Sequence, residues 1–376
     1  MLPGGRRPPV VNTTAFEIRN APVKDCVVKT LITRYQNLPG EHCASAAMRS
    51  LLNFYCDFDL PEEVIFGLGS GPDCVYVASE KSDPKISVFG RTVTLEVDIA
   101  QALGIDYVET TETDDEKAWE IVRQEVKEGR PTMLTGDIFY LDYRKFKVHF
   151  PGHRFVLVGF DDEKQIVYIA DRVDAKPQAC SYAAVAKSRN PPAGITPHNL
   201  WGKFQGTAIG HSLEEACALA LSKNADRMLG RDTSQTDLLK FGFDDDSLVT
   251  FSGLAGLEAL GREMPGWRAR EDAGFLASYL SQTIEKFGTG GGNFRKLYAG
   301  FLKWARGVRP DLVAKTLPEL SEQSASGWTG LAKTLRAASE APEDVEPWKR
   351  AAEEVKAIHE IETELFETID AAVAGR

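Results

Sequence analysis

The spacing of apolar residues changes character near residue 200, and this change constrains the fold more than any other feature of the chain. Before it, short apolar runs typical of strands alternate with stretches of helical spacing. After about residue 210, apolar residues recur every three to four positions in one stretch after another. The segment 190–194, with two prolines and a glycine, separates the two patterns. The spacing predicts an α+β domain over residues 21–200 and an all-α domain over residues 210–376.

The same periodicity predicts the individual elements. In the first domain we expect helices at 44–55 and 116–128, and strands at 132–134, 154–160 and 165–170. In the second domain we expect helices at 213–221, 254–260, 271–287, 294–308 and 348–373. Residues 1–20, which begin with a proline- and glycine-rich stretch, are expected to form a loose arm.

Composition narrows the classes of protein. The 376 residues suffice for two domains, and 43% hydrophobic beside 26% charged residues excludes a largely disordered chain. The formal net charge of −11 argues against nucleic acid as a partner. Residues 340–376 hold eleven acidic and four basic residues, so most of the excess negative charge lies there.

The sequence also indicates a compartment. Uncharged apolar runs such as 155–160 and 216–222 are far shorter than the roughly 20 residues of a membrane span. The sequence MLPGGRRPPVVN lacks the apolar segment of a secretory signal. The six cysteines form no Cys-x-x-Cys pair, which favours reduced thiols, a cytoplasmic location and no metal or other cofactor. Five of them have no histidine at ligand spacing and are expected to be structural: Cys26, Cys56, Cys74, Cys180 and Cys217.

Cys43 differs from the other cysteines because it opens the helix expected at 44–55. A thiol at a helix N-terminus faces unpaired amide groups and the positive end of the helix dipole, which stabilise the thiolate. A cysteine nucleophile requires this environment. The alternative is a small buried residue that happens to begin a helix.

A histidine and a carboxylate could act with this thiol. His153 immediately precedes the strand expected at 154–160, and Asp171 immediately follows the strand expected at 165–170. A three-residue turn between the strands would place His153 directly opposite Asp171, about 5 Å away. A four-residue turn would place Arg172 there instead.

Cys43, His153 and Asp171 have the residue types of a cysteine-nucleophile site, with His153 as base and Asp171 as the group that orients it. Asp161 cannot fill the last role, because eight residues of strand separate it from His153 by about 26 Å. His149 is the rival base, and His153 is favoured because a strand end fixes its direction. The alternative is a strand-end histidine and a turn aspartate without catalytic roles.

Several motifs give the chain a resemblance to a known family. The N-terminal half resembles the N-terminal domain of the butirosin-biosynthesis acyltransferase family, which is similar to papain-like and bacteriocin-leader peptidase folds. The motifs that carry this resemblance are Glu41-His42-Cys43, Phe66-Gly67-Leu68-Gly69-Ser70-Gly71, Gly152-His153, Gly159-Phe160-Asp161 and Ile169-Ala170-Asp171. Residues 284–298 resemble the helical domain of unassigned function that accompanies it. The resemblance covers roughly residues 25–376 and implies a papain-like catalytic domain followed by a helical one.

The resemblance implies transfer of an acyl group from an acyl-carrier-protein thioester, or a related thioester, to a small-molecule amine in specialised metabolism. It implies an acyl-cysteine intermediate, with Cys43 as nucleophile, His153 as base and Asp171 as orienting group. Papain-like enzymes carry a glutamine six residues before the cysteine as an oxyanion donor. Here Asn37 occupies that position and Gln36 precedes it, so either amide is a candidate donor.

Two glycine-rich stretches are further candidates for substrate binding. The first, which contains Gly69 and Gly71, lacks the Lys-Ser/Thr of a P-loop, and a close backbone approach near the cleft is the favoured interpretation. The second contains Gly290 and Gly291 and precedes Arg295. Its amides and Arg295 could bind a pantetheine phosphate or a substrate carboxylate. The alternative for this stretch is a helix end followed by a new helix.

Carrier proteins are usually acidic, so docking on this acidic chain would need a local basic patch. The candidates are Arg295, Lys296, Lys303, Arg306 and Arg309. Two other functions remain open: a cysteine hydrolase (a peptidase or thioesterase) that uses the same three residues, and a non-catalytic binding module that keeps the fold. Partitioning of the acyl group between amine and water separates transferase from hydrolase. Function that survives in Cys43→Ala would indicate the binding module.

Overall fold

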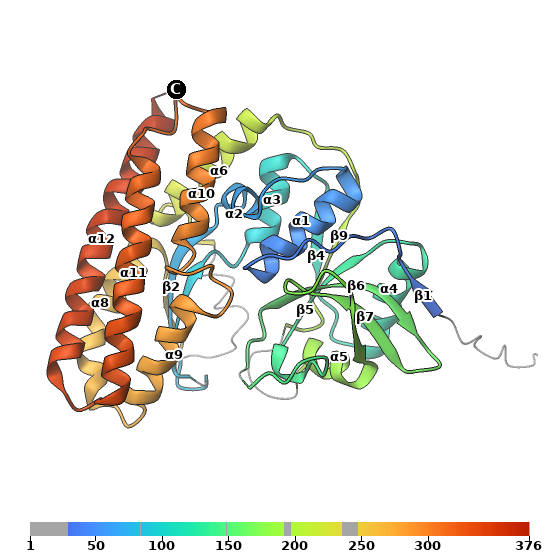
Figure 1. The fold of residues 1–376 in the computed structure, drawn as a ribbon, viewed down its shortest axis with the longest axis horizontal. Coiled ribbons are helices and arrows are strands. Elements are labelled where there is room, and N and C mark those ends of the chain that lie inside the picture. The colour runs from blue at the N-terminus through green and yellow to red at the C-terminus, as the bar shows by residue number, and fades with distance from the viewer. Residues whose placement is uncertain (1–28, 83, 148, 192–196, 235–246, 376) are drawn as a thin grey trace, which may run out of the picture.

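The computed structural model describes residues 29–82, 84–147, 149–191, 197–234 and 247–375 (Figure 1). The arm expected at residues 1–20 lies outside this part of the chain. Two groups of elements lie beside each other in Figure 1, one built around a sheet and the other dominated by long helices. At this level the mixed α/β fold with a helical C-terminal region agrees with the expected fold class.

A seven-stranded sheet forms the first group, with its strands in the order β4-β9-β5-β6-β7-β8 and β1 paired to the end of β6. The strands are β1 (Lys29–Leu31), β4 (Tyr107–Thr110), β5 (Thr132–Gly136), β6 (His153–Asp161), β7 (Ile166–Ala170), β8 (Gln178–Ser181) and β9 (Trp201–Phe204). All their pairings are antiparallel. All nine residues of β6 are buried, and six of them form the uncharged run 155–160. The three strands expected from the sequence are confirmed as β5, β6 and β7.

Helices pack around this sheet, and α1 contacts the central strand β6. The helices are α1 (Cys43–Cys56), α2 (Glu62–Leu68), α3 (Leu95–Leu103), α4 (Asp115–Lys127) and α5 (Tyr182–Arg189), with the short 3-10 helix η1 (Ile138–Tyr140). The two helices expected in this half are confirmed as α1 and α4. At the start of α1, the His42 ring accepts a hydrogen bond from the Ser45 N–H, and Asp57 ends the helix in the left-handed region at φ 51°.

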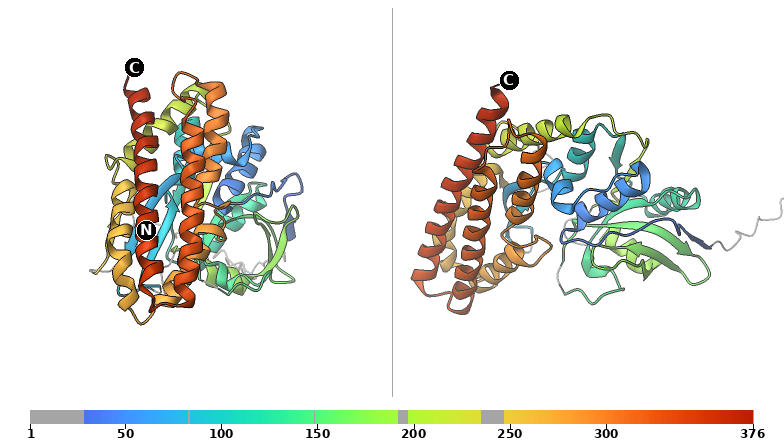
Figure 2. Two further views of the ribbon diagram at one scale, coloured as in Figure 1. Left: turned by 60° about the vertical axis from the view of Figure 1, so that its left-hand side comes forward. Right: turned by 45° about the horizontal axis from the view of Figure 1, so that its top comes forward.

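The second group combines a small sheet with long helices. Its sheet has the order β10-β2-β3, formed by β2 (Pro72–Ala78), β3 (Ile86–Arg91) and β10 (Val249–Phe251). Its helices are α6 (Leu213–Met228), α8 (Gly253–Glu263), α9 (Ala273–Glu285), α10 (Arg295–Val308), α11 (Leu317–Glu340) and α12 (Val345–Ala374), with the 3-10 helix η2 (Met264–Ala269). α11 and α12 lie side by side in every view (Figures 1 and 2). The helices expected after residue 210 are confirmed within α6, α8, α9, α10 and α12.

The C-terminal half differs from the expected all-α domain in one respect. β10 is a strand, and it pairs antiparallel with β2 from the N-terminal half of the chain. β2 and β3 pack against α8 and α9, so side chains from residues 72–91 join the hydrophobic core of the C-terminal helices. Local spacing could not show this, because the partners of β10 lie far earlier in the sequence.

The two groups are joined through α2 and α10. Phe301 of α10 lies directly over Gly67 of α2, where any Cβ atom would overlap the phenyl ring. Tyr298 and Phe301 belong to the same hydrophobic cluster as the buried residues of α1 and β6. This packing holds the start of α10 beside the start of α1.

Candidate active site

Cys43, His153 and Asp171 come together at the edge where β6 begins. Cys43 is the first residue of α1, His153 is the first residue of β6, and Asp171 follows the last residue of β7. The Cys43 thiol hydrogen-bonds to His153, and His153 Nε2 lies 3.2 Å from Asp171 Oδ1. Because Nε2 faces Asp171, Nδ1 is the ring nitrogen that remains for the thiol. The exposed fractions of the three residues are 6%, 3% and 3%.

Neighbouring groups hold Asp171 in place. Tyr143 Oη donates a hydrogen bond to Asp171 Oδ2 at 2.6 Å, and the Arg172 backbone N–H donates to Oδ1 at 2.7 Å. The Gly40 N–H donates to the Arg172 carbonyl oxygen at 2.8 Å, which ties the segment before α1 to the segment after β7. The thiol and the carboxylate are therefore fixed on opposite sides of the same imidazole.

Both expected registers of β6 and β7 are wrong, although His153 and Asp171 meet. Asp161 pairs with Ile166, and the register shifts between Leu157 and Gly159 at a bulge. Ala170 consequently lies opposite Val156 rather than nearer the start of β6. The Asp171 side chain reaches His153 from beyond the end of the β7 ladder. A turn length read from sequence does not show such a bulge.

The charges of this site favour a thiolate–imidazolium pair. Burial alone would raise the pKa of the Cys43 thiol, but hydrogen bonds with His153 and His42 lower it well below its ordinary value. Burial would lower the pKa of His153, but the charge and hydrogen bond of Asp171, and then Cys43, raise it to about 10. Burial would raise the pKa of Asp171, and the charge of His153 outweighs this and holds that pKa below its usual range. Both shifts favour a proton on His153 over a proton on the Cys43 thiol.

The other cysteines of the described residues have the opposite environment. Burial raises the pKa of Cys56, raises that of Cys74 strongly, and raises those of Cys180 and Cys217 to about 12. No disulfide joins the described cysteines. Cys26 lies outside the described residues. Cys43 is thus the described cysteine with the electrostatics of a nucleophile.

The two rejected partners lie elsewhere. His149 Nδ1 is 2.6 Å from Asp137 Oδ2, its side chain is half exposed, and its ring stacks on Phe139. Asp161 is at the opposite end of β6 from His153, where it pairs with Lys29 at 3.5 Å. This arrangement agrees with the choice of His153 over His149 from the sequence.

Neither candidate oxyanion donor, Asn37 or Gln36, has an amide group placed for that role in this structure. Asn37 Nδ2 donates to the carbonyl oxygens of Asp171 and Asp174, each at 2.6 Å, so both amide hydrogens are engaged. Asn37 therefore supports the backbone that carries Asp171. Gln36 is exposed to solvent.

The first glycine-rich stretch packs in the core. A Cβ atom on Gly69 would lie 2.5 Å from a Leu95 methyl group, and one on Gly71 would lie 2.4 Å from the Phe66 ring. These glycines allow α2, α3 and β2 to approach closely. They present no open surface to a substrate.

The second stretch lies against the start of α1. A Cβ atom on Gly288 would lie 3.3 Å from the Glu41 carbonyl oxygen, and one on Gly290 would lie 3.7 Å from the Glu41 Cβ. A Cβ atom on Gly291 would lie 2.7 Å from Lys296 Nζ. The stretch therefore connects the expected helix end and helix restart, and it also borders the site.

Arg295 is not a ligand-binding residue in this structure. It is 1% exposed, and its guanidinium donates to both carboxylate oxygens of Glu362, at 2.7 Å from Nε and 2.8 Å from Nη2. It also donates to the Gly90 carbonyl oxygen at 2.8 Å. The role of Arg295 is thus to fix the start of α10 to α12 and β3.

The candidate basic patch is partly neutralised. Lys303 pairs with Glu322 and Arg309 pairs with Asp311, while Lys296 and Arg306 are exposed. A surface hollow of about 300 Å³ lies along α10 and α11 and contains acidic as well as basic side chains. Its residues are Lys303, Arg306, Lys315, Pro318, Glu319 and Glu322. Lys296 and Arg306 are the members of the expected patch that remain available.

Two family models match this chain, each over a different part of it. Residues 42–172 match the family model Butirosin biosynthesis protein H, N-terminal. The region similar to that family contains Cys43, His153 and Asp171. Residues 184–369 match a Domain of unknown function (DUF4872). No curated protein matches the chain.

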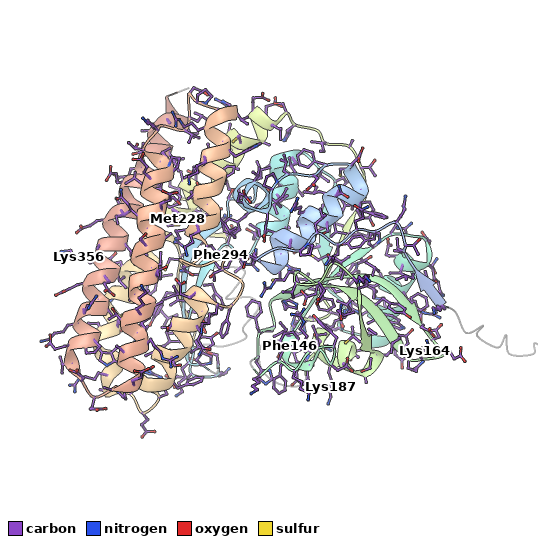
Figure 3. The ribbon with its side chains drawn as sticks, viewed as in Figure 1. Phe146, Lys164, Lys187, Met228, Phe294 and Lys356 are labelled. Carbon is purple, nitrogen blue, oxygen red and sulfur yellow. The ribbon has the colours of Figure 1, made fainter. Side chains whose placement is uncertain are left out.

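The region matched by the butirosin-biosynthesis family begins at His42, a residue to which the sequence reasoning assigned no role. His42 is 3% exposed and forms a hydrogen bond with the Cys43 thiol. Its ring lies edge-on to Phe294, with centroids 5.1 Å apart. Phe294 lies where the two groups of elements meet (Figure 3). The position of His42 directly before Cys43 is the signal in the sequence that could have indicated a role for it.

Within the described residues, no cluster of three or more His, Cys, Asp or Glu side chains has the arrangement of a metal site. The described helices include none with the length and apolar character needed to cross a bilayer.

Proposed function

We propose that this protein is a cysteine-dependent acyltransferase with a papain-like N-terminal domain. Cys43 is the nucleophile, His153 the general acid and base, and Asp171 the carboxylate that orients His153. The observation that carries this proposal is the buried contact of Cys43 with His153 and of His153 with Asp171, whose charges favour a thiolate. The name of the family matched by residues 42–172 supports a role in biosynthesis of a specialised metabolite.

The first half-reaction forms the acyl-enzyme. The Cys43 thiolate attacks the carbonyl carbon of the donor thioester, and a new carbon–sulfur bond forms to Cys43. The carbon–sulfur bond to the donor then breaks, and the His153 imidazolium gives its proton to the departing thiolate. His153 is left neutral, and Asp171 holds its ring in the same orientation.

The second half-reaction transfers the acyl group to the acceptor. A neutral amine attacks the acyl carbon, and His153 accepts the amine proton as the carbon–nitrogen bond forms. The bond to Cys43 breaks and the thiolate–imidazolium pair returns. The net reaction converts a thioester and an amine into an amide and a thiol.

The proposed donor is the thioester of an acyl carrier protein, and the proposed acceptor is a small-molecule amine. A carrier protein would dock near Lys296 and Arg306, two exposed cations on α10 that take part in no ion pair among the described residues. Arg295 is left out of this surface because it is buried against Glu362. Charge reversal at Lys296 and Arg306 should raise KM for a carrier-bound donor and leave KM for a small thioester unchanged.

The test follows the fate of an acyl group. Wild type and Cys43→Ala are incubated with a panel of acyl N-acetylcysteamine thioesters, with and without excess primary amine. We expect an acyl adduct on the Cys43 peptide by mass spectrometry, and amide product that depends on the amine. Free acid alone at saturating amine would instead indicate a hydrolase. Equal product from Cys43→Ala would overturn both enzymatic roles.

A further inference from the structure

The proposed reaction uses one imidazole, yet Cys43 contacts two. His42 lies immediately before Cys43, is 3% exposed, and hydrogen-bonds to the same sulfur as His153. A second buried imidazole on a nucleophile could compete for its proton or could stabilise the thiolate. The contacts of the His42 ring separate these two roles.

The contacts at His42 Nδ1 indicate which nitrogen carries the proton. The Ser45 backbone N–H, which belongs to the first turn of α1, donates to His42 Nδ1 at 3.3 Å. A backbone N–H can only donate, so Nδ1 must offer its lone pair. Ser45 Oγ lies 3.1 Å from the same nitrogen and donates its own proton to Glu62 Oε1 at 2.8 Å. The proton of a neutral His42 ring therefore resides on Nε2.

Glu62 fixes the backbone that leads into His42. Glu62 Oε2 accepts from the Glu41 N–H at 2.7 Å, and Glu62 Oε1 accepts from the His42 N–H at 2.8 Å. With the bond from Ser45 Oγ, this carboxylate holds the segment that leads into α1. His42 thus has little freedom to turn away from Cys43.

Aromatic packing fixes the plane of the ring. His42 lies edge-on to Phe66 and Phe294, at centroid distances of 6.0 and 5.1 Å, and these two phenyl rings stack on each other at 5.5 Å. Phe294 has φ 71°, which is rare for a bulky residue and clusters at functional sites when it occurs. The C-terminal helical region thereby contributes one wall of the His42 environment.

We infer that His42 is a fixed Nε2–H donor to the Cys43 sulfur, and that His153 alone exchanges the proton. This inference rests on the proposed role of Cys43 as nucleophile. The charged and titratable groups around the pair are consistent with a neutral His42: Arg91, Glu62 and Glu96 face His42, while His153 and Arg154 face Cys43. Burial, and then Arg91, lower the pKa of His42.

Five proteins test the inference by the pH dependence of iodoacetamide labelling at Cys43, read by peptide mass. They are the wild type, His42→Phe, His42→Gln, Phe294→Leu and His153→Ala. His42→Phe keeps a ring against Phe66 and Phe294 but removes the donor, so the midpoint of labelling should rise by about one to two pH units. His42→Gln restores an N–H group and should lie closer to wild type. Phe294→Leu leaves both imidazoles in place and should shift the midpoint less than His42→Phe.

The outcomes also separate this inference from the proposed function. An ordinary thiol titration in the wild type would overturn the nucleophile and the inference together. A low midpoint in wild type with no shift in His42→Phe would overturn the inference alone. Complete loss of low-pH labelling in His42→Phe, equal to that of His153→Ala, would make His42 a base and would also overturn it. Circular dichroism and urea unfolding establish that each variant is folded.

Discussion

Two helix starts meet in this molecule, and they bury opposite charges. α1 begins at Cys43, where the helix dipole and two imidazoles favour a thiolate. α10 begins at Arg295, where the same dipole disfavours a cation, and both oxygens of Glu362 offset that cost. His42 and Phe294, the residues directly before these helices, contact each other.

The difference lies in whether the buried charge pair can exchange a proton. The thiol and imidazole of the first pair can each bind or release a proton, whereas a guanidinium remains charged throughout. The pair at α1 is therefore suited to group transfer, and the pair at α10 to support. The predictions below break one pair at a time.

The largest effect is expected at Cys43 itself. Cys43→Ala removes the proposed nucleophile, so amide formation from an acyl thioester should fall by about 10⁴-fold or more. Cys56→Ala is a matched control, because Cys56 ends the same helix and is only partly buried. Equal rates for Cys43→Ala and wild type would contradict the account.

Replacement of Asp171 should have the next largest effect on the transfer rate. Asp171→Asn keeps the size of the side chain but removes the charge that raises the pKa of His153 to about 10. With that pKa lowered, His153 loses its proton at a lower pH, so the alkaline limb of the pH–rate profile should move toward neutral pH. The rate should fall by about 10² to 10⁴-fold.

Asp161→Asn is the control for this change, since Asp161 lies at the other end of β6. It should leave both limbs of the profile where they are in the wild type. An alkaline limb that does not move in Asp171→Asn would show that Asp171 does not set the proton affinity of His153.

Disruption of the Arg295–Glu362 pair should lower the stability of the fold and leave the chemistry at Cys43 unchanged. Glu362→Gln leaves Arg295 buried without a counter-charge, which should lower the free energy of unfolding by about 3 to 5 kcal/mol in urea denaturation. The folded fraction should keep the low-pH labelling of Cys43. The double variant Arg295→Met with Glu362→Leu should recover much of the loss, and no recovery would contradict this role.

The pKa of Glu362 determines how the contribution of the Arg295–Glu362 pair to the free energy of unfolding depends on pH. Burial would raise the pKa of this carboxyl, but the charge and hydrogen bonds of Arg295 hold it below its ordinary value. A carboxyl with a depressed pKa stabilises the fold above its unfolded pKa, and this contribution is lost as pH falls through the folded value. The deficit of Glu362→Gln should therefore be largest at neutral pH and shrink in acid.

The smallest effect is expected at His149. It pairs with Asp137 at a half-exposed position, and such pairs contribute little. His149→Ala should leave the labelling midpoint of Cys43 unchanged and the transfer rate within about a factor of five, since surface pairs are worth about 0 to 1 kcal/mol. Loss of low-pH labelling in this variant would transfer the role of base from His153 to His149.

Local patterns were sufficient to predict the elements that carry the site. The apolar stripe of α1, the helical spacing of α4 and the apolar run of β6 all appear at the predicted residues. They place Cys43 at a helix start and His153 at a strand start, which are local properties. The choice of His153 over His149 followed from the same reasoning.

Features that depend on distant partners could not be predicted. The bulge between Leu157 and Gly159 changes the register of β6 and β7 without a local signal. The sequence makes Arg295 a candidate for docking because it lies among other basic residues. Its pairing with Glu362, a residue far along the chain, could not be predicted. The pairing of β10 with β2, and the contact of His42 with Phe294, likewise join residues far apart in the chain.

α11 was missed for a different reason. Small and polar residues interrupt its apolar spacing, among them Ser321, Ser324, Gly327 and Gly330. Ser324 Oγ donates to Glu362 at 2.6 Å, and Gly327 lies close to Ile358 of α12. These small residues allow α11 to approach α12 closely. The residues that weaken the apolar pattern in the sequence are therefore the ones that permit the packing of the two helices.

The central claim, a thiolate on Cys43 maintained by His153, has a direct test that needs no substrate. The measurement is the pH dependence of iodoacetamide labelling at Cys43, in wild type and His153→Ala, read by peptide mass. An unperturbed thiol titrates near 8.5, so rapid labelling of wild type at pH 6 that is lost in His153→Ala is the predicted result. Labelling of wild type with the midpoint of an ordinary thiol, or equal labelling of the two proteins at pH 6, would contradict it.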